Sequence, residues 1–256
     1  MKKLFNSFRA AFAMYSRIPM PLTDWSQENL KYMFVFFPFV GAVIGLLSCL
    51  AAFGGRRLGL LPSFGCAVLT VLPILVTGGI HVDGLLDTAD ALSSWRERER
   101  RLEILKDPHM GAFGVITAGV YFLLTYGAFR QIWDRQDLLT VMGVGYVLSR
   151  CLSGISVMSF PKAKKEGTVA EFSLKAEEVL VRRILAAFAF LCGAGMVAVH
   201  PAAGGGAFVF ALLVFAYYGR MSKKYFGGIT GDLAGFFLCI CETGMTVVLG
   251  VLSAFV

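Results

Sequence analysis

The sequence predicts an all-α fold: a polytopic bundle of about seven transmembrane helices plus an N-terminal amphipathic helix, in a single integral-membrane domain over residues 1–256. Two observations predict it. The chain is 57% hydrophobic and only 16% charged, whereas soluble domains are about 45–50% apolar and about 25% charged. Its apolar residues also gather in long stretches, each close to the length needed to cross a hydrocarbon layer of about 30 Å.

Seven such stretches lie at about residues 32–53, 60–80, 112–132, 138–160, 182–200, 206–220 and 233–256. Gly54-Gly55 and the run Gly204–Gly206 are interpreted as turns. Gly41 and Gly45, four residues apart in the first stretch, predict that another helix approaches closely. The charged segment 161–178 is predicted to be a solvated loop that is partly helical near its end.

The first twenty residues predict an amphipathic helix on the membrane surface. Arg9 and Arg17 interrupt the apolar run and no small-residue cleavage site follows it, so a signal peptide is not expected. The apolar side chains instead recur at helical spacing; they are Leu4, Phe5, Phe8, Ala11, Phe12 and Tyr15.

The basic residues predict the orientation of the bundle. Of the 24 Lys and Arg, nineteen lie in alternate connecting segments on one side, four lie on the other side, and Arg150 lies within a stretch. By the positive-inside rule, the side with nineteen basic residues is cytoplasmic. The N-terminus then lies on the cytoplasmic side of the cell membrane and the C-terminus on the outer side. The net charge of +7 is therefore explained by the orientation of the chain in the lipid bilayer. Nucleic acid is not an expected partner, since no nucleic-acid-binding motif is present.

Several chemistries are excluded by motif. The six cysteines form no Cys-x-x-Cys pair and lie in apolar stretches, so they are interpreted as buried apolar side chains. The sequence has no GxxxxGK[ST], GxSxG or HExxH pattern, which excludes P-loop enzymes and two hydrolase classes. No covalent nucleophile is indicated.

The most informative segment contains Asp83, Asp87 and Asp90. On a helix these positions are i, i+4 and i+7, so the three carboxylates share one face. Like charges at this spacing repel by about 0.2–0.5 kcal/mol per pair in water, and no Lys or Arg lies within one turn of the first two. A divalent cation is the obvious neutralising partner, and carboxylate oxygens favour Mg²⁺, Mn²⁺ or Ca²⁺ over Zn²⁺.

Two glycine-rich clusters follow on the predicted cytoplasmic side. The first contains Lys106, Asp107, Gly111 and Gly114, where backbone N–H groups at a helix start favour an anion and Asp107 offers another metal ligand. The second places Asp232 after Gly231, at the start of the last stretch, where a carboxylate can cap a helix or bind a metal. Carboxylates, basic side chains and glycine loops together indicate a site for a diphosphate.

Two charged residues lie within apolar stretches. Glu242 is about 15 Å deeper than Asp232 if the last stretch is one straight helix, so it is either a further site residue or a protonated acid bonded to a neighbouring helix. Arg150 needs an anionic partner, which is either a phosphate or a buried carboxylate.

The sequence resembles the cobalamin synthase (adenosylcobinamide-GDP ribazoletransferase) family over nearly its whole length. The most specific likeness is the H-x-D-G-x-x-D-x-x-D pattern at His81–Asp90. The other matches follow in the family's order: Ser16-Arg17-Ile18-Pro19, Phe37-Pro38-Phe39-Val40-Gly41, Lys106-Asp107 with Gly111 and Gly114, Ser149-Arg150, Thr230-Gly231-Asp232 with Gly235, and Glu242.

The resemblance implies a magnesium-dependent transferase that joins adenosylcobinamide-GDP to α-ribazole or α-ribazole 5′-phosphate and releases GMP. It implies that Mg²⁺ is held on the diphosphate by an acidic set comprising Asp83, Asp87, Asp90, Asp107 and Asp232. The groups expected to bind or balance the phosphates are Arg17, Lys106, Arg150, Gly111, Gly114 and Gly231. His81, or a carboxylate free of metal, would take the proton of the attacking hydroxyl.

Two other functions stay open on the residues alone. A CDP-alcohol phosphotransferase shares acidic D-G-x-x motifs, although its usual D-G-x-x-A-R opening is not matched at Asp87-Thr88. A cation-coupled transporter would use Glu242 and Arg150 along a path through the membrane. Other enzymes of corrinoid synthesis are conceivable partners, and the sequence does not indicate an oligomeric state.

Overall fold

The computed structural model describes residues 2–21, 25–163 and 177–255, and the described chain is helical with no strand longer than one isolated bridge, between Lys162 and Ile229. The helices are α1 (Lys2–Tyr15), α2 (Gln27–Leu30), α3 (Met33–Arg57), α4 (Pro62–Thr77), α5 (Ile80–Ser93), α6 (Arg98–Ile104), α7 (Ala112–Ile132), α8 (Gln136–Ser159), α10 (Glu178–Val199), α11 (Pro201–Phe226) and α12 (Gly231–Leu252).

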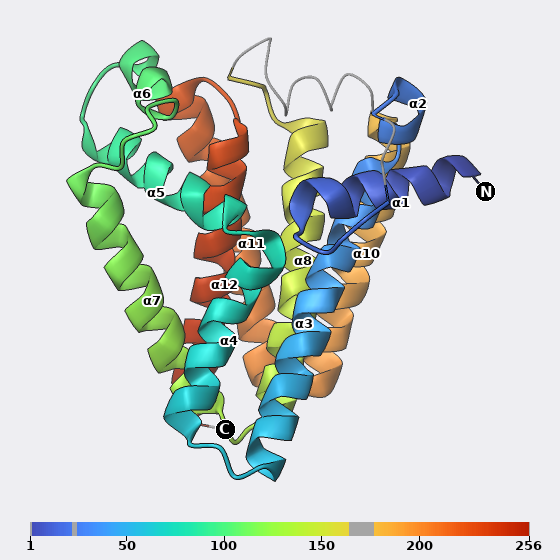
Figure 1. Ribbon diagram of the computed structural model, residues 1–256, viewed down its shortest axis with the longest axis vertical. Helices are drawn as coiled ribbons and strands as arrows, with labels where there is room; N and C mark the ends of the chain where they lie inside the picture. Colours follow the sequence, from blue (N-terminus) through green and yellow to red (C-terminus); the bar gives the residue numbers. More distant parts are fainter. Residues whose placement is uncertain (1, 22–24, 164–176, 256) are drawn as a thin grey trace.

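The prediction of about seven membrane crossings in a helical bundle is confirmed. Six helices, α3, α7, α8, α10, α11 and α12, are long and apolar enough to span a bilayer, and the pair α4–α5, bent by 96°, supplies a seventh when counted as one broken span. Successive crossings alternate in direction (Figure 1). Helices α1, α2 and α6 gather at one end of the bundle, and the α3–α4 turn and the C-terminus lie at the other. The first end is called the α6 end below.

Helix α8 forms the centre of the bundle and packs against α3, α10 and α12. The predicted close approach at Gly41 and Gly45 is confirmed, because a Cβ atom on Gly41 would lie 2.2 Å from the Tyr146 carbonyl oxygen, and one on Gly45 would lie 2.4 Å from that of Gly143. Two glycines therefore let α3 and α8 meet backbone to backbone.

The interpretation of the two glycine runs as turns is wrong. Gly54-Gly55 lies in the last turns of α3, and Gly204–Gly206 lies near the start of α11. The turn before α11 occurs earlier, where His200 caps the helix and Pro201 occupies its first position. Gly204 instead gives α10 room, since its Cβ would fall 2.0 Å from the Met196 carbonyl oxygen. The sixth span is consequently longer than residues 206–220.

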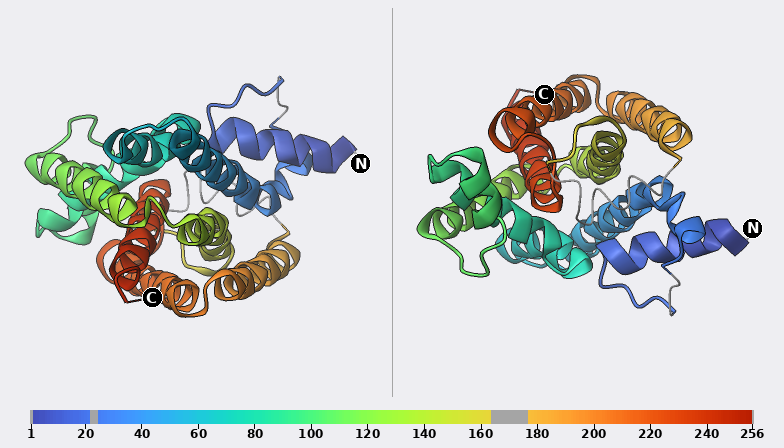
Figure 2. Two further views of the ribbon diagram at one scale, coloured as in Figure 1. Left: turned by 90° about the horizontal axis from the view of Figure 1, so that it is seen from below. Right: turned by 90° about the horizontal axis from the view of Figure 1, so that it is seen from above.

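The predicted amphipathic helix is confirmed as α1. It lies across the α6 end of the bundle and runs beside α3 (Figure 2). Ala11 and Phe12 are buried, whereas Leu4 and Phe5 remain about half exposed on the outer side. Such a face is suited to the boundary between headgroups and acyl chains.

The charged segment 161–178 is described only in part. Ala163 donates a backbone hydrogen bond to Ile229 at 3.0 Å, and Ile229 donates one to Pro161 at 2.8 Å. These bonds tie the end of α8 to the turn before α12. The prediction of a solvated loop falls on residues 164–176, which lie outside the described part of the chain.

Candidate active site

A sharp corner between α4 and α5 places the acidic motif across the α6 end. Gly78 and Gly79 have φ angles of 71° and 84°, a region that glycine enters without strain. The Arg17 backbone N–H donates to the Val76 carbonyl at 2.7 Å, and a Cβ on Gly78 would lie 2.6 Å from the Arg17 Nε. The corner therefore holds Arg17 against the start of α5.

Four carboxylates, from Asp83, Asp87, Asp90 and Asp232, form what we call the acidic cluster. The first three share one side of α5, as predicted, and Asp232 comes from the first turn of α12. The two helices touch through their backbones, because a Cβ on Gly84 would lie 2.6 Å from the Asp232 carbonyl oxygen. The negative charges of the other three carboxylates all act on Asp87, so the cluster repels itself and favours a cation.

The donor chemistry of the cluster fits a magnesium ion that is shared with a substrate. Within the described residues, no three acidic, histidine or cysteine side chains converge closely enough to enclose a metal by themselves. Mg²⁺ does not need such a cage, since it commonly keeps several waters and is held by one or two carboxylates together with substrate phosphates. The two carboxylates nearest to that role are Asp83 and Asp232, which line one cavity.

Asp90, which the sequence analysis expects to bind a metal, accepts two backbone hydrogen bonds from the start of α7. Its Oδ2 accepts from the Gly111 N–H at 2.8 Å, and its Oδ1 accepts from the Gly114 N–H at 2.9 Å. The two glycine N–H groups that the sequence offered to a phosphate are thus bound by the chain's own carboxylate, at the N-terminus of α7. Asp90 joins α5 to α7, and we name this contact the Asp90 clamp.

The charged residues of the loop before α7 are exposed. Asp107 accepts hydrogen bonds from the His109 backbone N–H at 3.0 Å and from its Nδ1 at 2.9 Å, and these bonds hold the pKa of Asp107 below its usual value. Asp107 is not among the charges that act on Asp87. Lys106 beside it is exposed. The contacts that the structure gives Asp107 are with His109, and the site roles predicted for Asp107 and Lys106 stay predictions.

At the start of α12, Asp232 is not the capping residue. Thr230 is the N-cap, and its Oγ1 accepts from the Leu233 N–H at 3.2 Å. Gly231, the first residue of α12, is exposed and lines the same cavity as Asp232.

That cavity, of about 200 Å³, lies between α1, α3, α5, α8 and α12. One wall is aromatic and comes from Tyr15, Phe34 and Phe37. The ring centroids of Tyr15 and Phe37 are 4.3 Å apart, and those of Tyr15 and Phe34 are 6.3 Å apart. Sequence reasoning missed this wall, because it placed Tyr15 on the apolar stripe of the amphipathic helix and gave Phe37 no role beyond its match to a family motif.

A second part of the lining, the polar wall, comprises His81, Asp83, Ser153 and Asp232. His81 lies 6.1 Å from Phe37 between ring centroids. Its Nε2 is buried and has no hydrogen-bond partner in the described part of the chain. The two walls combine a place for a flat apolar group with groups that bind metal or accept a proton.

Arg150 and Glu242 meet inside the bundle. The Arg150 Nη1 donates to the Glu242 Oε1 at 2.7 Å, and the Ser149 hydroxyl donates to the same oxygen at 2.7 Å. Arg150 is fully buried, and Glu242 is 14% exposed. Of the alternatives left open by the sequence, the structure shows the buried pair.

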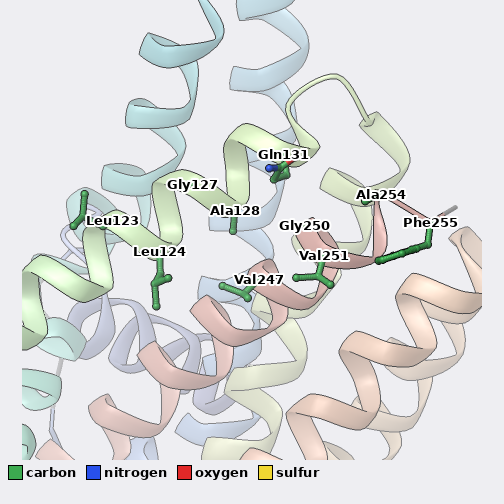
Figure 3. Close-up of a pocket in the computed structure, with 10 residues that line it drawn as sticks. All are labelled: Leu123, Leu124, Gly127, Ala128, Gln131, Val247, Gly250, Val251, Ala254 and Phe255. Atoms are coloured by element: carbon green, nitrogen blue, oxygen red, sulfur yellow. The ribbon is translucent and has the colours of Figure 1, made fainter.

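The opposite end of the bundle holds a different kind of hollow, an open groove of about 490 Å³ between α7 and α12 (Figure 3). No acidic or basic side chain lines it; the lining residues are Leu123, Leu124, Gly127, Ala128, Gln131, Val247, Gly250, Val251, Ala254 and Phe255. This groove therefore presents no ionisable side chain.

Comparison with known proteins gives one consistent result. The profile of the cobalamin-5-phosphate synthase family matches residues 7–250. An adenosylcobinamide-GDP ribazoletransferase from Lachnoclostridium phytofermentans is 42% identical, over 96% of this chain and 95% of its own length. Namesakes from Azorhizobium caulinodans (33%) and Desulfitobacterium hafniense (32%) are similar over 91% and 92% of this chain, and over 90% and 91% of their own lengths. No solved structure matches.

Proposed function

The chain belongs to the cobalamin-5-phosphate synthase family, and from that premise we propose how its site works. It is a transferase of cobalamin biosynthesis that joins adenosylcobinamide-GDP to ribazole. This assignment displaces the two alternatives, a CDP-alcohol phosphotransferase and a cation-coupled transporter. The proposal concerns the residues, the metal and the orientation.

The reaction is a displacement at phosphorus. A ribose hydroxyl of ribazole attacks the phosphorus atom attached to cobinamide, a new P–O bond forms, and the bond to the bridging oxygen of the diphosphate breaks. GMP leaves with that oxygen, and the hydroxyl proton passes to a base. Enzymes accelerate such transfers by positioning the reactants and by stabilising charge on the phosphate oxygens.

We assign metal binding to Asp83, Asp87 and Asp232. Asp83 and Asp232 both line the cavity, and the negative charges of both act on Asp87. Bound Mg²⁺ would withdraw charge from the diphosphate oxygens and so ease the departure of GMP. We leave Asp90 out of this set because each of its oxygens accepts a hydrogen bond from an N–H group at the start of α7.

His81 is assigned as the group that takes the hydroxyl proton. Its Nε2 lacks a partner, and its side chain lines the cavity beside Asp83. Arg17, held at the α4–α5 corner, is assigned to the phosphates. Lys106 is exposed at the same end of the bundle, where it can meet the anionic substrate as it arrives.

The orientation follows from the distribution of charge. The described parts of the segments predicted to be cytoplasmic lie at the α6 end with the acidic cluster (Figure 1), and these segments together hold nineteen of the 24 basic residues. We therefore propose a protein of the cell membrane whose site faces the cytoplasm.

The observation that carries the proposal is the convergence of Asp83 and Asp232, from helices far apart in sequence, on one cavity. The test incubates the purified protein with adenosylcobinamide-GDP, α-ribazole and Mg²⁺ and measures GMP and cobalamin. We expect chelation of Mg²⁺ to stop product formation, and Asp83→Asn and Asp87→Asn to abolish it without loss of folding. Asp137→Asn, in an exposed pair with Arg135 away from the site, is the control. Normal turnover by Asp83→Asn would refute the metal assignment.

A further inference from the structure

We propose that the cavity between α1 and α5 binds the base of ribazole against its aromatic wall, with the ribose directed toward His81 and Asp83. The inference rests on the proposed function and adds to it a subsite for one substrate. It begins with the division of the cavity into two chemically different walls.

The aromatic wall offers contact area and few polar groups. Tyr15 ends α1, and Phe34 and Phe37 lie one turn apart on α3, so the rings converge from two helices. Phe34 and Phe37 are almost fully buried. A planar ligand that lies against this wall gains stacking contacts without leaving polar groups unpaired.

The polar wall comes from α5, α8 and α12. Asp83 and Asp232 carry negative charge, and His81 presents a nitrogen with no partner in the described part of the chain. A ligand that lies across the cavity must therefore be apolar and flat at one end and rich in hydroxyl groups at the other.

Among the groups that the reaction brings together, ribazole has this character. Its benzimidazole base is flat and apolar, and its ribose carries the hydroxyl that reacts. A guanine base presents acceptors at N7 and O6 and a donor at N2, which the phenylalanine rings cannot satisfy. A corrin ring with its side chains is too large for a cavity of about 200 Å³.

The chain that forms the wall is held in place near the chemistry. Ser16 donates its hydroxyl to the Phe12 carbonyl at 2.7 Å, and the next residue, Arg17, bonds to Val76 at the end of α4. Tyr15 is therefore fixed against the corner that also orients α5. The helix that lies on the membrane surface thus contributes directly to substrate binding.

The first test compares Tyr15→Ala with Tyr15→Phe in the full-length protein. Loss of one base–aromatic stack corresponds to a change of at least about fivefold, so Tyr15→Ala should raise the KM for α-ribazole by that factor or more. The KM for adenosylcobinamide-GDP should stay unchanged, and Tyr15→Phe, which keeps the ring, should resemble the parent. Tyr217→Ala, an exposed aromatic on α11, is the matched control.

A second test fills the cavity instead of opening it. Ala234 lines the cavity, so Ala234→Leu should weaken α-ribazole binding, while Ala186→Leu on the exposed side of α10 should not. Binding is measured by titrating α-ribazole into the protein without Mg²⁺ or corrinoid, so this readout does not depend on turnover. The subsite is wrong if Tyr15→Ala and Ala234→Leu raise the KM for adenosylcobinamide-GDP instead of that for α-ribazole. It is also wrong if these two variants bind α-ribazole as the parent does. A parent protein that binds α-ribazole but forms no GMP would contradict the proposed function alone.

Discussion

Arg150 carries a positive charge and is not exposed to solvent, and Glu242 is the carboxylate that pairs with it. Ionised side chains inside a membrane protein pair with one another or line a functional path. Here the pair is closed by the Ser149 hydroxyl, and Arg150 also lies 5.9 Å above the Phe37 ring. Arg150 thus reaches the substrate cavity indirectly, through a ring that lines it.

Substitutions of Glu242 should separate a structural role from a catalytic one. Glu242→Leu leaves a buried cation unpaired and should lower the free energy of unfolding by about 3–5 kcal/mol. Glu242→Gln keeps an acceptor for Arg150 and Ser149, so its cost should be smaller, about 1–3 kcal/mol. Thermal unfolding in detergent measures both. The exposed Glu103, paired with Arg100, provides the control, and Glu103→Gln should change stability by less than about 1 kcal/mol. Equal losses for Gln and Leu at position 242 would contradict this account.

The acidic cluster should reveal its repulsion when the metal is removed. In the presence of a chelator, Asp87→Asn should stabilise the fold by a few tenths of a kcal/mol, because it removes one of four mutually repelling charges. Melting temperatures of the two proteins, with and without Mg²⁺, measure the effect. Excess Mg²⁺ should raise the melting temperature of the parent more than that of the variant. An identical response to Mg²⁺ would show that Asp87 does not contribute to the ion's site.

At the scale of the helices, contacts that depend on distant residues were the ones the sequence could not reveal. The spacing of Asp83, Asp87 and Asp90 predicted one shared face correctly. It could not show that Asp90 binds the N–H groups of Gly111 and Gly114, because that contact depends on how the loop around α6 returns the chain to α5. The aromatic wall depends in the same way on the position of α1 over α3.

The Asp90 clamp should be sensitive to one methyl group. A Cβ on Gly114 would lie 2.6 Å from the Asp90 Oδ2, so Gly114→Ala should lower stability by about 1–3 kcal/mol through loss of a hydrogen bond to a charged group. Gly119 lies on the same helix with nothing within 4 Å of its Cβ position. Gly119→Ala should be neutral or slightly stabilising. Chemical unfolding of both variants makes the comparison, and a milder effect at Gly114 than at Gly119 would refute the clamp.

Neighbouring glycines at the α10–α11 contact offer a second matched pair. Gly204→Ala should destabilise the bundle, since its methyl group would fall 2.0 Å from the Met196 carbonyl oxygen. Gly205→Ala should be tolerated, because the nearest atom to its methyl group lies 3.9 Å away. Melting temperatures again decide, and equal tolerance would mean that α11 starts as a turn after all.

At the scale of the whole molecule, charge and hydropathy together predicted more than either alone. The apolar stretches gave the number of crossings, and the alternation of basic residues matched the ends at which the structure places the connecting segments (Figure 1). The break between α4 and α5 was not predicted, because residues 60–80 form one apolar stretch in the sequence and the acidic motif follows directly.

Topology can be tested with reporter fusions. Fusions after Arg57 and Arg135 should report the outside of the membrane, and fusions after Arg101 and Lys224 the inside. This pattern follows from seven crossings with the N-terminus inside. If the broken α4–α5 span does not cross, the reporters after Arg101, Arg135 and Lys224 will all be inverted while the reporter after Arg57 is not.

The shortness of α4 bears on how the protein is made. Its 16 residues rise only about 24 Å, less than a hydrocarbon core of about 30 Å, and the polar residues of α5 follow at once. During synthesis α4 is therefore a poor independent candidate for insertion, and we expect it to enter the bilayer as a hairpin with the strongly apolar α3, to which four residues connect it. The site can then form only late in synthesis, because α5 cannot take its place until the α3–α4 hairpin has been inserted and α12 has been translated.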